Sequence, residues 1–230
     1  KDSGYFANSP NYLYVTKQRI NYKNNYQIEL ILPSSGKKVV AKTNIVYTPL
    51  VAYPVSPSQK IIAIQTTSTM QIQFGAPKNG KIFDAYFVFN YTEIDAFDTS
   101  KKTDKSIEWK ILRSYRTLSD QGKEYVIQRI PGILFYDLLL NNIPYNPNII
   151  RKFKPCSFML VSGNQELDNY IQASTPSIGI VQKQSEYTNV SNGVGIFGSR
   201  NTYYIDQVDL SDITKNTIVS GADYKKMGFV

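Results

Sequence analysis

The chain has 230 residues and a formal net charge of +8, and 42% of its residues are hydrophobic against 19% that are charged. This balance excludes a disordered chain, and the length suits one β-type domain or two small ones. The chain has no histidine and a single cysteine, Cys156, which excludes histidine-based catalysis, multi-cysteine zinc sites and an internal disulfide framework.

The first third of the chain predicts strands. "NYLYVT" (residues 11–16) alternates between two faces, and "NYQIELIL", "PSSGKK" and "KVVAKTNIVY" (residues 25–47) predict a hairpin. Three prolines in residues 49–57 exclude a central strand and indicate a linker. We therefore expect residues 1–48 to form part of a β-sandwich, immunoglobulin- or transthyretin-like, completed by strands that precede it. Residues 49–230 would form a larger β-rich domain.

The larger domain is expected to contain a β-meander followed by a few short helices. Its strands are predicted at "KIIAIQTTSTMQIQF", "KIFDAYFVFNYTEI", "KSIEWKILRSYRTLS" and "SDQGKEYVIQRI". Apolar residues at helical spacing predict helices near residues 131–143 and near residues 164–173, the second with Asn164 as a possible cap. "SGADYKKMGFV" would add one closing helical turn. The predicted fold class is mainly β.

Gly193, Gly195 and Gly198 spell the G-x-G-x-x-G of a dinucleotide loop. That loop works between a strand and a helix, whereas here a polar turn precedes it and "SRNTYYIDQV", which alternates like a strand, follows. We therefore interpret these residues as a turn at residues 191–193 leading into a strand, with Ile196 and Phe197 in the core. No cofactor is expected.

The acidic residues give a weak indication of a metal site. Glu93 and Asp95 share one strand face and Asp98 follows, so the three could ligate calcium, or the first two could serve a glycosidase. Asp206, Asp209 and Asp212 recur every third residue, which is typical of a loop or a helix cap. For both groups a solvated surface is the favoured interpretation.

Aromatic residues provide the candidate ligand-binding groups. Trp109 with Tyr115, and Tyr203 with Tyr204, are possible stacking platforms for sugar rings, although packing in the core or on a sheet face is the favoured interpretation. Cys156 is expected to be a small buried hydrophobe.

The basic residues suggest no nucleic-acid partner. They occur as scattered pairs such as Arg151-Lys152 and form no long basic block, which favours a solvated surface. An acidic glycan or a lipid head group stays open as a partner.

Residues 131–200 resemble the C-terminal half of uncharacterised lipoproteins of Bacteroidetes. The resemblance is carried by "IPGILFYDLLLNNIPYNPNIIRKF" and by "SGNQELDNYIQASTPSIGIVQKQSEYTNVSNGVGIFGSR", which ends in the family's closing signature. The signature residues are Asn192, Gly193, Gly195, Phe197 and Arg200, and we interpret their role as structural. "NYQIELILPSSGKKVVAKTNIVYTP" is similar to a hairpin in domains of unknown function from lipoproteins often encoded near TonB-dependent receptors.

The resemblance implies an extracytoplasmic outer-membrane lipoprotein, with an N-terminal lipid anchor that is itself an expectation because the printed chain shows no lipobox cysteine. It implies no catalytic residues. We expect a non-enzymatic binding or accessory protein whose partner is an outer-membrane complex or a TonB-dependent receptor. The alternatives are a carbohydrate-binding or sugar-processing surface protein and a structural component of a secretion or adhesion complex.

Overall fold

The structure is a computed structural model that describes residues 14–175 and 186–230. It is mainly β with a few short helices, which confirms the predicted fold class. The strands are β1 Asn25–Ile31, β2 Lys38–Asn44, β3 Leu50–Tyr53, β4 Ile61–Ile62, β5 Thr69–Gly75, β6 Ile82–Asp95, β7 Lys102–Arg116, β8 Tyr125–Pro131, β9 Ile149–Phe153, β10 Cys156–Gly163, β11 Val190–Ser191 and β12 Arg200–Leu210. The helices are α1 Ile133–Asn142, α2 Gln165–Ser174, α3 Asp212–Ser220 and the 3-10 turn η1 Lys225–Met227.

The largest sheet has the strand order β4-β12-β10-β6-β7, and β9 pairs with the far end of β6. Alternation along β6 gives the sheet two different faces. One face is apolar and buried, with Phe83, Phe87 and Phe89 fully enclosed. The other face carries Asp84 and Tyr86 and is partly open to solvent.

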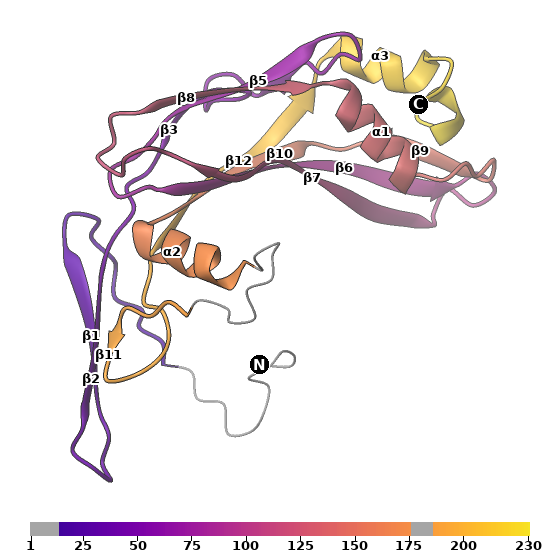
Figure 1. The fold of residues 1–230 in the computed structure, drawn as a ribbon. Coiled ribbons are helices and arrows are strands. Elements are labelled where there is room, and N and C mark those ends of the chain that lie inside the picture. Colours follow the sequence, from indigo (N-terminus) through magenta and orange to yellow (C-terminus); the bar gives the residue numbers. More distant parts are fainter. Residues whose placement is uncertain (1–13, 176–185) are drawn as a thin grey trace, which may run out of the picture.

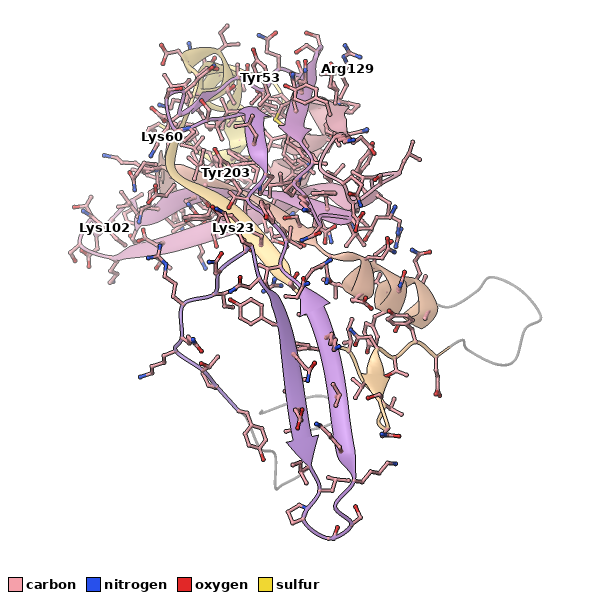
Figure 2. All side chains as sticks on the ribbon, turned by 90° about the vertical axis from the view of Figure 1, so that its left-hand side faces the viewer. Lys23, Tyr53, Lys60, Lys102, Arg129 and Tyr203 are labelled. Carbon is pink, nitrogen blue, oxygen red and sulfur yellow. The ribbon has the colours of Figure 1, made fainter. Side chains whose placement is uncertain are left out.

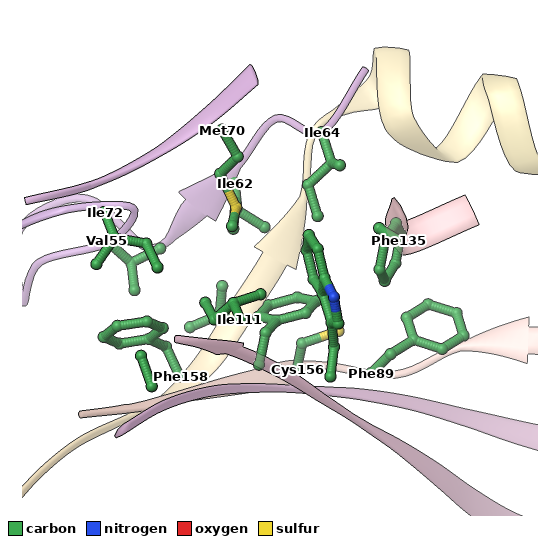
Figure 3. Close-up of a cluster of buried hydrophobic side chains, with 14 of the residues drawn as sticks. Val55, Ile62, Ile64, Met70, Ile72, Phe89, Ile111, Phe135, Cys156 and Phe158 are labelled. Atoms are coloured by element: carbon green, nitrogen blue, oxygen red, sulfur yellow. The ribbon is translucent and has the colours of Figure 1, made fainter. Parts of the chain in front are cut away.

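A second sheet, of order β3-β5-β8, lies over the buried face of the first (Figure 1). Side chains from both sheets fill the space between them, and α1 and α3 cover the part of the large sheet that the small one leaves (Figure 1). Figure 3 shows Ile62, Ile64 and Met70 facing Phe158 and Cys156 across this core. The body of the protein is therefore a sandwich closed at one end by helices.

Both predicted helices are confirmed, and one has the expected cap. The Asn164 side chain accepts a hydrogen bond from the amide of Leu167 at the start of α2. The sequence does not predict helix α3, because aspartates that recur every third residue indicate a loop or a helix cap. Ser211 caps it by accepting from the amide of Thr214.

The predicted meander is wrong. β10 inserts between β6 and β12, and β5 pairs with β8 across the whole β6-β7 hairpin. The proline-rich residues 49–57 also contain a short strand, β3, which is an edge strand as its flanking prolines require. Within "NYLYVT", residues 14–16 form no strand, and residues 11–13 lie outside the described part.

The predicted hairpin, β1-β2, is confirmed and projects away from the sandwich (Figures 1 and 2). Its turn contains Gly36 at φ 64°, a left-handed conformation that suits glycine. Residues 190–191 from the other half of the chain add a third strand, β11, to the free side of β2. The hairpin therefore shares its sheet with a segment from the C-terminal half.

Candidate functional site

The three acidic residues that could ligate a metal, Glu93, Asp95 and Asp98, each bind a different partner within the protein. Glu93 forms an ion pair at 2.8 Å with Arg151, whose side chain is 2% exposed. Asp95 accepts hydrogen bonds from main-chain amides two and three residues later, and Asp98 accepts from Ser100. Within residues 14–175 and 186–230 no three metal-ligating side chains form a cluster.

The aspartates at 206, 209 and 212 are also dispersed. Asp206 lies 3.6 Å from Lys60, and Asp209 pairs with Lys215 at 2.8 Å. Asp212 stands in the first turn of α3, where its charge favours the helix dipole. Helix capping and surface ion pairs thus account for these residues.

The aromatic candidates lie on different faces. Trp109 is 7% exposed and packs against Phe135 in the core, and Tyr115 is half-buried against the same core. Tyr203 points inward; burial raises the pKa of its phenol, whose oxygen has no hydrogen-bond partner in the described part of the chain. Tyr204 is 59% exposed on the opposite face. Tyr204 is therefore the candidate ring open to solvent.

The glycine-rich signature forms a turn, as predicted, but the strand after it begins only at Arg200. Asn192 adopts φ 59° and its side-chain amide donates to the carbonyl of Lys38 in the hairpin. Gly195 adopts φ 145°, a conformation that residues with a side chain rarely adopt. Phe197 is half-buried rather than part of the core. The loop feeds strand β12 and no helix, so it lacks the helix N-terminus of a phosphate site.

Side-chain amides attach the projecting hairpin to the body. Fully buried Asn164 donates to Thr43 at 2.9 Å and to Asn44 at 3.2 Å, while its oxygen accepts from the amides of Leu167 and Ser199. Further amide or hydroxyl bonds to hairpin and linker carbonyls come from Asn79, Asn189, Ser191, Asn192 and Asn201. The signature segment is thus part of the hairpin's attachment.

A groove of about 490 Å³ lies between α2 and the open face of the large sheet. Gly163 permits this packing, because a Cβ there would stand 2.6 Å from a methyl of Leu167. The helix is held by an ion pair at 2.5 Å between Arg116 and fully buried Asp168. The floor of the groove includes Met159 and Val161 from β10.

Three cross-strand neighbours form a row on the open face of the large sheet, and two of them, Tyr86 and Met159, line the groove. Register places Tyr86 beside Met159, and Met159 beside Tyr204. The Lys110 ammonium lies 5.2 Å from the centre of the Tyr86 ring and 2.9 Å from Asp84. Burial acts to lower the pKa of Lys110, but hydrogen bonds to Asp84 and Tyr86 outweigh it and the net shift is upward.

Two opposite charges on the groove have no described partner. The side chains of Glu108 and Arg200 both line it, and neither forms a hydrogen bond or ion pair within residues 14–175 and 186–230. Arg200 belongs to the signature that the resemblance identifies, whereas Glu108 is not one of the candidates named from the sequence. Tyr86 and Met159 were missed, since their neighbourhood depends on β10 lying between β6 and β12.

A second cavity, of about 530 Å³, lies where the hairpin meets the body. Phe197 and Arg200 of the signature line it, so Arg200 borders both cavities. We call it the junction cavity.

Comparisons with known proteins add no relative. No family model, curated protein or solved structure matches the chain. Among the described residues, no helix combines the length and the apolar character that crossing a bilayer requires.

Proposed function

We propose that this protein is a non-enzymatic binding protein of the bacterial cell envelope, and that the groove beneath α2 holds its ligand. The envelope location, the lipid anchor and the role as an accessory to an outer-membrane complex or TonB-dependent receptor follow from the resemblance of residues 131–200. The groove supports the binding role, because concave sites with an apolar floor and a few polar groups are where small ligands bind.

The observation that carries the proposal is the pair of unpartnered charges on the groove. Glu108 offers a carboxylate to a donor group, and Arg200 offers a guanidinium to an acceptor or an anion. Met159 and Val161 supply an apolar surface. A small organic molecule with polar groups and an apolar body satisfies all of these.

The test is a thermal-shift screen of small polar metabolites, followed by calorimetry on those that raise the Tm. Glu108→Gln should weaken binding by about tenfold, through loss of a charged acceptor. Asp223→Asn, which removes an exposed acid outside the groove, is the matched control. Failure of every compound to raise the Tm, or an unchanged affinity in Glu108→Gln, contradicts the proposal. Fractionation of bacteria that express the precursor tests the envelope location.

A carbohydrate ligand is the second candidate, and the row of Tyr86, Met159 and Tyr204 favours it. Tyr86 and Tyr204 flank Met159 on the open sheet face, an arrangement on which a sugar ring can stack. A glycan array separates this candidate from the first. Binding that is lost in Tyr204→Ala supports it, and no binding at high protein concentration excludes it.

A structural role in a secretion or adhesion complex is the third candidate, favoured by the projecting hairpin. Within the part of the chain that the structure describes, strand β1 is an edge strand that pairs with β2 alone, and its residues are almost all exposed. Free edges of this kind can accept a strand from another protein. Pull-down from outer membranes with the tethered protein, compared with the untethered chain, tests it through the recovery of a stable complex.

A further inference from the structure

The junction cavity differs in character from the groove beneath α2. It is formed by the segment before β1, by the end of the hairpin and by the start of β12. Its apolar lining consists of Ile20, Tyr22, Tyr26, Ile45, Val46 and Phe197. Figure 2 shows the place where the hairpin leaves the body, near Lys23.

Part of this apolar lining is open to water. Ile20 is 58% exposed and Tyr22 is 49% exposed, although the Tyr22 ring packs against Tyr47 at 4.7 Å. Exposed apolar surface around a cavity is typical of a ligand site, because a ligand that covers it removes that surface from water. The volume of about 530 Å³ is within the usual range for a small-molecule site.

The charges of the cavity have one sign. Arg19 and Arg200 contribute two guanidinium groups, and no acidic residue is among the described residues that line it. Neither arginine side chain forms an ion pair or hydrogen bond within residues 14–175 and 186–230. A ligand that carries a negative charge complements these two groups, and a guanidinium binds a carboxylate through two parallel hydrogen bonds.

We propose that the junction cavity binds a fatty acid, with the carboxylate at Arg19 and Arg200 and the alkyl chain against Ile20, Tyr22 and Phe197. The two arginines supply the selection for an anion. The apolar lining supplies the affinity for the alkyl chain, in proportion to the apolar area that binding removes from water. This site is separate from the proposed ligand groove, although Arg200 borders both.

The test is calorimetric titration with laurate below its micelle concentration, alongside dodecanol and dodecyltrimethylammonium, which share the chain but lack the negative charge. Laurate should bind at least tenfold more tightly than either. Arg19→Gln should weaken laurate by roughly tenfold, the effect of one lost charge-assisted hydrogen bond. Arg113→Gln, an exposed arginine of β7 outside the cavity, is the matched control and should leave laurate binding unchanged.

Several outcomes overturn the proposal. Equal binding of laurate and dodecanol shows that the cavity recognises the alkyl chain alone. An unchanged affinity for laurate in Arg19→Gln shows that the carboxylate does not bind at Arg19. Tighter binding of dodecyl phosphate, or binding only to vesicles of an anionic phospholipid, shows that the cavity recognises a phosphate head group or a bilayer. Because Arg19 does not line the groove beneath α2, loss of laurate binding in Arg19→Gln with groove binding intact separates the two sites. Thermal melts of Arg19→Gln confirm that the fold is retained, since Arg19 is exposed.

Discussion

Replacing Asn164 by alanine should release the hairpin from the body. The substitution removes the N-cap of α2, which costs about 1 kcal/mol. It also leaves the buried amide of Ser199 without its acceptor, which costs a further 1–3 kcal/mol or about 2 on average. Both bonds to Thr43 and Asn44 are lost as well. We expect a fall of about 3 kcal/mol in the free energy of unfolding.

Urea denaturation measures the total fall in the free energy of unfolding, and native-state hydrogen exchange shows which strands lose stability. Amides of β1 and β2 should lose protection before those of β6 and β10, because the hairpin depends on polar attachments. Asn164→Ser keeps an oxygen that can cap α2, so it should recover about 1 kcal/mol. Asn142→Ala deletes an exposed amide at the end of α1 and is the control. A loss below 1 kcal/mol in Asn164→Ala, or equal loss of protection in all strands, would refute the reasoning.

Three further substitutions test the core, the loop and the C-terminal end. Burial raises the pKa of Cys156 from 9.0 to about 11, so the folded state retains a proton that the unfolded state loses. The contribution of this thiol to the free energy of unfolding is fully present below pH 9 and falls by about 3 kcal/mol between pH 9 and 11. Urea denaturation at several pH values should show a smaller decrease over this range in Cys156→Ala. Gly195→Val places a branched side chain at φ 145° and should cost about 1–3 kcal/mol in a thermal melt, and an unchanged Tm would contradict the structural reading of the signature. Glu93→Gln leaves the buried charge of Arg151 unpaired and should cost about 3 kcal/mol; since Arg151 also donates to the carbonyl of Met227, carboxypeptidase should remove the C-terminal residues faster than in the unaltered protein.

Local patterns predicted individual elements well. Alternation identified β6, β7 and β8, and Asn164 identified the start of α2, because both signals depend on neighbouring residues alone. The order of the strands depends on pairings between distant segments, which no local pattern contains. A meander was therefore expected where β10 in fact lies between β6 and β12.

For the candidate sites as well, the sequence identified single residues but not the distant residues that lie beside them. Tyr204 and Arg200 were singled out from the sequence, and both border cavities or open faces in the structure. Their partners could not be predicted, since Tyr86 meets Tyr204 only through Met159 on an inserted strand. Trp109 is a candidate stacking platform in the sequence, yet its face of β7 packs on the core.

The long sequence separation of the hairpin's attachments has a consequence for synthesis. Asn189, Ser191 and Asn192 bond to hairpin carbonyls 147 to 154 residues earlier in the chain. At the roughly 5–20 residues per second of translation, these residues are made about seven to thirty seconds after the hairpin. During that interval both of its edges lack partners and are open to aggregation. Docking of the hairpin is then a late step that closes a large loop, so a nascent chain stalled before residue 189 should be a substrate for chaperones.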